Sequence, residues 1–163
     1  MAGEVSFDVV SDFDEQELRN ALDQVRREVQ QRYDFKGATV DLTQEKTQIV
    51  LVTNDDFRAR AVRDLIESKA VRRNLSLKIF DWGVVEPSGG NKVREVITLR
   101  RGLTDDLARK LVKQIRDEFP KVQPRIQGDA IRVSAKSKDE LQRVISRLRE
   151  LDLEVPLQFE NYR

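Results

Sequence analysis

The sequence predicts an α+β protein that consists of two similar modules in tandem, and three observations lead to this prediction. Two stretches, 48–66 and 130–148, each contain an alternating apolar strand, a polar break and an amphipathic helix. Their apolar residues match at a constant offset of 82 residues, with Ile49, Leu51, Val62 and Ile66 corresponding to Ile131, Val133, Val144 and Leu148. The chain has 163 residues, which is enough for two small domains.

The first half has the element order β-α-β-β-α-β. Apolar residues that alternate predict its strands, and apolar residues that recur every three to four positions predict its helices. Asp14 and Glu17 resemble a capping box at the start of the first helix, and Asn54 or Asp55 can cap the second. The predicted elements are strand 5–9, helix 14–33, strands 38–42 and 49–53, helix 54–71 and strand 75–82.

The second half repeats this order. Thr104 can cap its first helix, and Pro120 predicts where that helix ends. Gly128-Asp129 predicts a tight turn between two strands, and Ser137 with Glu140 forms a second capping box. The predicted elements are strand 93–99, helix 104–119, strands 122–126 and 131–133, helix 137–151 and strand 157–159.

Two β-α-β-β-α-β units predict two tandem ferredoxin-like sandwich domains, each a four-stranded antiparallel sheet with two helices on one face. The clearest break in the chain is the Pro- and Gly-rich stretch 87–91. We therefore expect a first domain over 1–85, a linker over 86–92 and a second domain over 93–163. One alternative remains open at this point, because the N-terminal strand could be exchanged between the halves and pair with C-terminal strands.

The sequence contains no convincing catalytic set. It has no Cys and no His, which excludes disulfides, thiolate metal sites, Cys nucleophiles and the commonest general base. The Gly-rich stretch 88–92 precedes a predicted strand, so it lacks the helix N-terminus of a phosphate-binding loop. Acidic pairs such as Asp55-Asp56 lie at helix starts, where capping explains them. We expect a protein that is not an enzyme and uses no metal or cofactor.

The same composition favours a cytoplasmic protein. Charged residues make up 36% of the chain, and no apolar run approaches the length that crosses a membrane. The N-terminus MAGEVSFDVV lacks the basic and apolar regions of a signal peptide. Since each half is small for an independent core, we expect the halves to pack on each other or on a partner, as a monomer or weak oligomer.

The distribution of charge favours the second half for contact with phosphates. Residues 1–83 hold 13 Lys and Arg and 16 Asp and Glu, a net charge of −3, whereas residues 84–163 hold 17 and 13, a net charge of +4. Arg109, Lys113 and Arg116 lie on one stripe of a predicted helix and could follow a nucleic-acid backbone, although an ordinary solvated face also explains them. The other candidate cations are Lys92, Arg100, Arg132 and Lys136.

Two aromatic residues are candidates for stacking. Alternation along the predicted strand 75–82 places Phe80 and Trp82 on the face opposite Leu77 and Ile79, and Trp82 could stack on a base. The alternative is that both rings are buried between the two halves. The strands 48–52 and 131–134 carry no aromatic ring, which argues against the binding mode of RNA-recognition domains.

Four phrases of the sequence together resemble the bacterial YajQ family of nucleotide-binding proteins. The phrases are Ser6–Ser11, Arg32–Gly37, Ile126–Val133 followed by Lys136–Gln142, and Pro156–Arg163. Their order and spacing resemble those of the family over nearly the whole chain. Two positions depart mildly from the family pattern, with Ala135 where Gly is usual and Tyr162 where Phe is usual.

The resemblance implies two ferredoxin-like domains and a cytoplasmic protein that binds nucleotides or nucleic acid. Members of this family are associated with GTP, tRNA and cyclic di-GMP, and some with transcriptional control. The leading hypothesis is therefore a protein that binds guanine nucleotides, cyclic di-GMP, tRNA or another nucleic acid without catalysis. The alternative is a protein-interaction adaptor or transcription-related regulator that docks a protein partner through an exposed sheet face.

Overall fold

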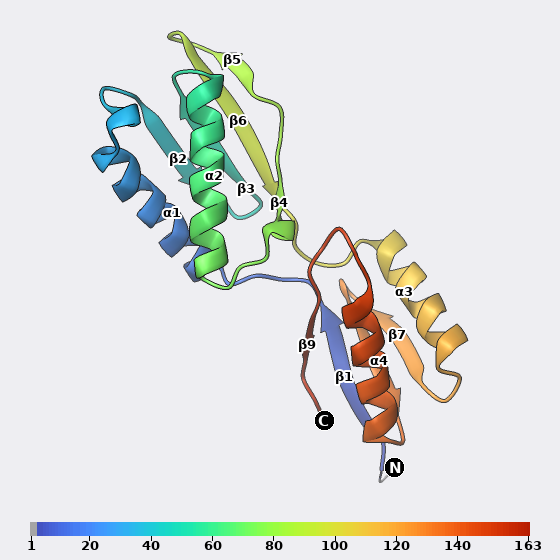
Figure 1. Cartoon of the computed structure of the whole chain (residues 1–163). Helices are drawn as coiled ribbons and strands as arrows, with labels where there is room; N and C mark the ends of the chain where they lie inside the picture. Colours follow the sequence, from blue (N-terminus) through green and yellow to red (C-terminus); the bar gives the residue numbers. More distant parts are fainter. Residues whose placement is uncertain (1–2) are drawn as a thin grey trace. The chain divides into compact units, whose positions relative to one another are not determined.

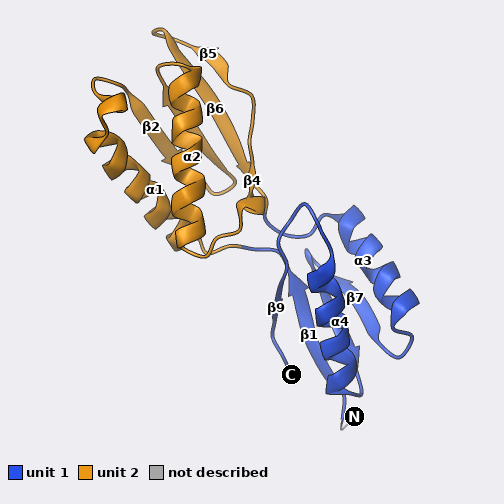
Figure 2. Ribbon diagram, in the orientation of Figure 1, with its two compact units in different colours: residues 1–12, 101–163 blue, residues 13–100 orange. Residues whose placement is uncertain are grey.

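The structure, a computed structural model, describes residues 3–163 and divides them into two compact units (Figure 2). Unit 1 comprises residues up to 12 together with 101–163, and unit 2 comprises residues 13–100. Each unit contains an antiparallel sheet with two helices on one face, which confirms the predicted α+β fold of two ferredoxin-like halves (Figure 1).

Unit 2 contains two helices and one sheet with the strand order β2-β3-β6-β4, in which β5 also pairs with β6. Helices α1 and α2 cover the same face of this sheet (Figure 1), and apolar side chains from both layers form its core. Its elements are α1 (Glu15–Gln31), η1 (Tyr33–Phe35), β2 (Val40–Gln44), β3 (Gln48–Thr53), α2 (Asp56–Arg72), η2 (Leu77–Ile79), β4 (Phe80–Asp81), β5 (Glu86–Ser88) and β6 (Lys92–Leu99).

Unit 1 contains the other two helices and a sheet with the strand order β7-β8-β1-β9. The C-terminal residue extends the β9 side of this sheet, because Arg163 and Ser6 exchange two backbone hydrogen bonds. The elements are β1 (Val5–Val10), α3 (Asp105–Glu118), β7 (Gln123–Gln127), β8 (Ala130–Ala135), α4 (Lys138–Glu150) and β9 (Gln158–Glu160).

The helix starts follow the predicted caps. Asp14, Asp55, Thr104 and Ser137 each accept backbone N–H groups of the following turn through a side-chain oxygen. The apolar positions that recur along each helix are buried against the sheets, including Val25 of α1, which is fully buried. These signals are local, so the sequence predicts the helices well.

The N-terminal strand is exchanged between the halves. In β1, Phe7 lies opposite Val133 of β8, and Val9 lies opposite Phe159 of β9. In return, β6 pairs with β3 of unit 2, with Ile97 opposite Ile49. Unit 1 is therefore a β-α-β-β-α-β fold with unit 2 inserted after its first strand. Unit 2 is the same fold, except that the strand in this first position comes last in the sequence.

This division differs from the expected domains 1–85 and 93–163 with a linker over 86–92. The Pro- and Gly-rich stretch forms the turn of a hairpin between β5 and β6, in which Gly90 and Asn91 have positive φ angles of 71° and 57°. The chain passes between the units after residue 12 and after residue 100. Composition cannot distinguish a hairpin turn from a linker, because both need the same residue types.

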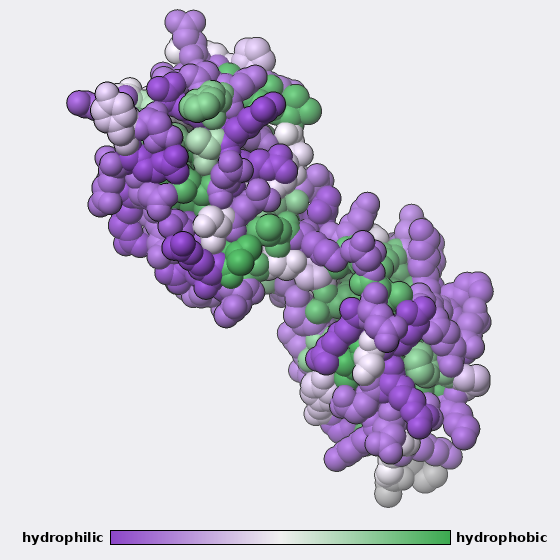
Figure 3. Space-filling model, viewed as in Figure 1, coloured by the Kyte–Doolittle hydropathy of each residue, from purple (hydrophilic) through white to green (hydrophobic). Residues whose placement is uncertain are grey.

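The exchange also removes the charge difference between the halves. Unit 1 holds 14 Lys and Arg and 14 Asp and Glu over all its residues, whereas unit 2 holds 16 and 15. Hydrophilic side chains cover most of the face shown in Figure 3. No helix within residues 3–163 is both long and apolar enough to cross a bilayer. Any preference for phosphates must therefore come from local clusters of cations.

Candidate functional site

The candidate residues are divided between the two units. Unit 2 contains Phe80, Trp82, Lys92 and Arg100, and unit 1 contains Arg109, Lys113, Arg116, Arg132 and Lys136. Their local surroundings decide which of these side chains can meet a ligand.

Phe80 belongs to the core of unit 2. Its side chain is 3% exposed, and its ring centroid lies 5.4 Å from that of the half-buried Trp82. The predicted alternation with Leu77 and Ile79 is wrong, because residues 77–79 form the short 3-10 helix η2 and the strand begins only at Phe80. Ile79 and Phe80 are consequently both buried. Phe80 offers no ring surface to a ligand.

Trp82 is already stacked within unit 2. The guanidinium carbon of Arg63, on α2, lies 4.5 Å from the centroid of the Trp82 ring, which is the geometry of a cation–π contact. The charge of Arg63 also acts on a buried carboxylate that is not among the predicted site residues, Glu95 of β6, which is 4% exposed. Burial raises the pKa of Glu95, and the charge of Arg63 partly offsets this rise. The sequence does indicate this burial, because Glu95 precedes Ile97 by two residues and so lies on the same face of the strand as the apolar side chains.

Arg100 binds the backbone of its own unit. Its guanidinium donates to the carbonyl oxygens of Lys78 and Phe80, at 3.2 and 3.4 Å, and forms an ion pair with Asp81 at 3.6 Å. These contacts fix β4 against β6.

Lys92 begins β6 and is half-buried, and no ion pair to it is found among residues 3–163.

Arg132 is occupied by an internal ion pair. It lies opposite Asp8 on the sheet face that α3 and α4 leave uncovered, and its guanidinium donates to both Asp8 oxygens at 2.9 and 3.3 Å. The Asn161 amide donates to the same carboxylate at 2.8 Å. Hydrogen bonding from Arg132 lowers the pKa of Asp8, with a smaller contribution from Asn161. A ligand would have to compete with Asp8 for this guanidinium.

The structure brings three of the candidate cations together in one groove. Arg109, Lys113 and Arg116 are spaced four and three residues apart on α3, and they line a hollow of about 520 Å³ beside the edge strand β7. Arg125 of β7 also lines this hollow, but it lies opposite Arg132 in the strand register and therefore starts on the sheet face away from α3. We call this hollow the cationic groove; its other lining residues are Val112, Asp117, Pro124 and Ile126.

The cations of the groove outnumber its acids. Lys113 forms an ion pair with Asp117 at 2.8 Å, and the hydrogen bond that its ammonium donates to this carboxylate raises the pKa of Lys113. Arg109 approaches Asp106 at 3.9 Å. Within residues 3–163, Arg116 and Arg125 have no ion pair. On the α3 side of the hollow, Arg116 therefore has a guanidinium group that is free to bind an anion beside the apolar floor.

The equivalent place in unit 2 has different chemistry. A hollow of about 440 Å³ lies between α1 and the edge strand β2, but its Arg26 already donates to the Leu42 carbonyl at 2.6 Å and to Asp23 at 2.7 Å. Lys36 is the other cation in its lining. The two copies of the fold thus differ in their chemistry at this position.

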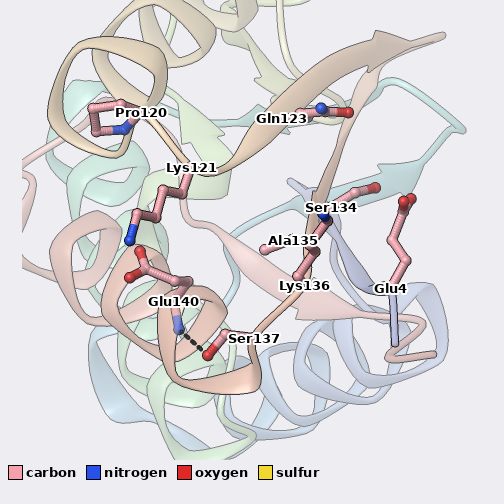
Figure 4. Close-up of a pocket in the computed structure, with 9 residues that line it drawn as sticks. All are labelled: Glu4, Pro120, Lys121, Gln123, Ser134, Ala135, Lys136, Ser137 and Glu140. Carbon is pink, nitrogen blue, oxygen red and sulfur yellow. Dashed lines mark hydrogen bonds between the residues drawn. The ribbon is translucent and has the colours of Figure 1, made fainter. Parts of the chain in front are cut away.

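Lys136 lies apart from the cationic groove. It lines a separate cavity at the start of α4 (Figure 4).

Among residues 3–163, no group of three or more acidic side chains is placed to hold a metal ion.

Known proteins match this chain over nearly all of its length. A family model described as nucleotide-binding protein YajQ-like matches residues 5–163. A nucleotide-binding protein of Chloroflexus aggregans is 59% identical, and one of Synechococcus elongatus is 57% identical. Another nucleotide-binding protein, from Roseiflexus castenholzii, is 53% identical. Each of these alignments covers 100% of both chains.

Proposed function

The chain belongs to the YajQ-like family of nucleotide-binding proteins, and from this premise we propose that it binds guanine nucleotides or cyclic di-GMP in the cationic groove of unit 1. The observation that carries the proposal is the stripe of Arg109, Lys113 and Arg116 along one hollow, which Arg125 of the edge strand β7 also lines. The choice of guanine ligands, and of tRNA as a further ligand, rests on the family resemblance.

The chemistry of the groove suits a phosphorylated ligand. Arg guanidinium groups bind phosphate oxygens in pairs of parallel hydrogen bonds, and Arg116 and Arg125 have no internal partner that would compete. The apolar side chains of the floor, which include Val112 and Ile126, supply surface for a base. A volume of about 520 Å³ is within the range of small-molecule sites.

Binding without turnover is part of the proposal. The chain contains no His and no Cys, so acid–base or nucleophilic chemistry would need Lys or carboxylate groups. The acidic pairs that could act as such groups lie at helix starts. Asp55 caps α2, and the negative charge of Asp105 interacts favourably with the dipole of α3. We also propose a cytoplasmic location, in agreement with the ligand class.

A protein-interaction adaptor is the second candidate, and one residue makes it less favourable at the groove. A partner strand would add to the edge strand β7 through backbone hydrogen bonds. Pro124 is the second residue of β7 and has no N–H group to offer to such a strand. A small anion needs no such donor, so the groove favours a nucleotide over an extended peptide.

The test is calorimetric titration with GTP and cyclic di-GMP. Replacing Arg116 and Arg125 together by Gln should weaken binding at least tenfold, because each charged hydrogen bond contributes about 1.5–3 kcal/mol. Lys36→Gln, in the equivalent hollow of unit 2, is the control and should leave affinity unchanged. For tRNA, the same double variant should reduce the slope of log affinity against log salt by about 2.

Trp82 provides an independent readout, because it is the only Trp in the chain. A ligand held by the groove alone leaves Trp82 emission unchanged during a titration. Quenching that persists in the Arg116 and Arg125 double variant would assign binding to Trp82 and Arg63 and refute the groove. Absence of binding to every nucleotide at low salt would refute the proposed function as a whole.

A further inference from the structure

Strand β2, at one edge of the sheet in unit 2, has backbone groups that face away from the sheet (Figure 1). Glu45 donates its N–H group to the carbonyl oxygen of Gln48 at 2.8 Å, so this pair closes the hairpin between β2 and β3. Hydrogen-bonded pairs alternate along antiparallel strands, and the backbone groups of Leu42, opposite Leu51, therefore point outward. The carbonyl oxygen of Leu42 accordingly accepts from Arg26 of α1 at 2.6 Å. Within residues 3–163, no acceptor for the Leu42 N–H group is found.

Unit 1 closes the equivalent position with a proline. Pro124 lies opposite Val133 in β7 and β8, as Leu42 lies opposite Leu51 in β2 and β3. The two pairs are related by the same offset of 82 residues that relates the two copies of the fold. Where unit 2 has an outward N–H group, unit 1 therefore has a ring without a donor.

The other sheet edges are also protected. Proteins protect exposed edges with very short strands, prolines or covering side chains. The edge strands β4, β5 and β9 have only two or three residues each. Strand β2 has five residues and no proline, and the guanidinium of Arg26 covers only one of its carbonyl groups. Among the edges that the structure describes, β2 is the one best suited to pair with another strand.

The hollow of about 440 Å³ between α1 and β2 lies beside this open edge. Side chains of a strand added next to β2 would alternate between the two faces of the sheet, so every second one points to the helix side, as Val40 does. Val40, Val29 and Phe35 give the hollow an apolar lining. Its charged lining residues are Arg26 and Lys36, and Lys36 is exposed and has no ion pair inside residues 3–163. The hollow therefore favours a segment with apolar and acidic side chains.

We propose that β2 is a docking site for a protein partner, which adds an extended segment to this edge as a further strand. The N–H group of Leu42 donates to a carbonyl oxygen of the segment. An apolar side chain of the segment enters the hollow, and an acidic side chain next to it on the same face pairs with Lys36. The site lies in unit 2 and does not depend on the nucleotide binding proposed for the cationic groove of unit 1.

The experiment uses the full chain and a random peptide library displayed on phage as the probe. Peptides with apolar and acidic residues at alternate positions should be enriched. The most enriched peptide is then synthesised and titrated. At saturation, amide hydrogen exchange at Leu42 should slow far more than at Thr43, because the N–H group of Thr43 already faces β3 whereas that of Leu42 gains a partner.

Two variants test the named contacts. Leu42→Pro gives unit 2 the closed edge of unit 1 and should weaken peptide binding about tenfold, because it removes the outward donor. Leu42 is 7% exposed, so circular dichroism must first show that this variant is folded. Lys36→Glu changes only an exposed side chain and should weaken binding about fivefold, as expected for an exposed ion pair. The control is the double variant of Arg116 and Arg125, which should keep full peptide affinity, so that the two proposals fail separately.

The docking site is refuted if no peptide is enriched, if exchange slows elsewhere than at β2, or if Lys36→Glu and a folded Leu42→Pro both bind normally. Sedimentation of the free chain tests the other occupant of an open edge. A dimer that Leu42→Pro dissociates would assign β2 to a second copy of this chain and would also overturn the proposal. A monomer whose Leu42 amide is protected only by the peptide supports it.

Discussion

Single residues of this protein are often committed to partners that lie far away in the sequence. The sequence suggests Arg132 as a phosphate ligand, but the structure pairs it with Asp8, which is 124 residues away. Arg100 likewise holds backbone carbonyls of β4. By contrast, Arg109, Lys113 and Arg116 converge as helical spacing predicts, because their neighbourhood is local. Ion pairs across strands depend on register, which a single sequence does not reveal.

The pair of Asp8 and Arg132 makes unit 1 sensitive to acid. The pKa of Asp8 is lowered in the folded protein, so its contribution to stability is present above the ordinary carboxyl pKa of about 4 and is lost as pH falls through the lowered value. We predict that Asp8→Asn reduces the free energy of unfolding by about 1–3 kcal/mol at pH 7. At pH 2 the variant and the native protein should differ much less.

Urea unfolding at the two pH values measures this difference. The matched control is Glu160→Gln, because Glu160 lies beside Asp8 on β9 without an ion pair inside residues 3–163. Its effect should stay within about 0.5 kcal/mol. Equal losses in both variants would mean that the ion pair of Asp8 contributes nothing specific.

Glu95 has the opposite pH dependence. Burial raises the pKa of Glu95, so the folded protein binds the proton more tightly than the unfolded chain does. The resulting stabilisation is fully present below the ordinary Glu pKa and is lost as pH rises through the raised pKa. We predict that Glu95→Gln is more stable than the native protein at pH 8, by about 1 kcal/mol. The gain should disappear at pH 4, where Glu95 is protonated. Urea midpoints at both pH values decide this, and a loss of stability at pH 8 would contradict it.

Helices of this protein can be predicted from sequence more completely than its strand pairings. Each helix carries its own cap and apolar stripe, as at Thr104 and Ser137, so its limits are encoded locally. Strands such as β1 and β6 are equally evident as alternating segments, yet their partners lie in the other half of the chain. The segment 75–82 also starts with a 3-10 helix before its strand begins.

The contact between the segment after β4 and strand β6 depends on one glycine. A Cβ atom added at Gly83 would overlap the carbonyl oxygen of Val96, so the backbone of one segment would have to move. We predict that Gly83→Ala lowers the stability of unit 2 by about 1–3 kcal/mol, as overpacking usually does. Gly89→Ala is the control, since nothing lies within 4 Å of its added Cβ. Chemical denaturation compares them, and equal stabilities would show that the strands separate easily.

At the scale of the whole molecule, the two units differ in how they are encoded. Unit 2 is one continuous segment, 13–100, whereas unit 1 is assembled from both ends of the chain. The internal repeat correctly predicts two similar units, because burial imposes the same apolar spacing in both. It cannot show which copy contains a given strand, since exchanged strands carry the same pattern.

Fragments of the chain test this organisation. The fragment 13–100 contains every strand of the sheet β2-β3-β6-β4, so we predict that it folds alone, with dispersed amide NMR signals and cooperative unfolding. The fragment 1–85 lacks β6, and the fragment 93–163 lacks β1, so each loses a central strand. Both should be largely unfolded. A folded fragment 1–85 would contradict the exchange of strands.

The insertion of unit 2 into unit 1 also sets an order of events during synthesis on the ribosome. Strand β1 emerges before unit 2, but its neighbours β8 and β9 end at residues 135 and 160. At about 5–20 residues per second, the 60 residues from 100 to 160 take roughly 3–12 s after unit 2 is complete. During this interval Phe7 and Val9, which are fully buried in the finished protein, have no sheet to join. The nascent chain thus exposes the apolar strand β1, which chaperones can bind until β8 and β9 have been synthesised.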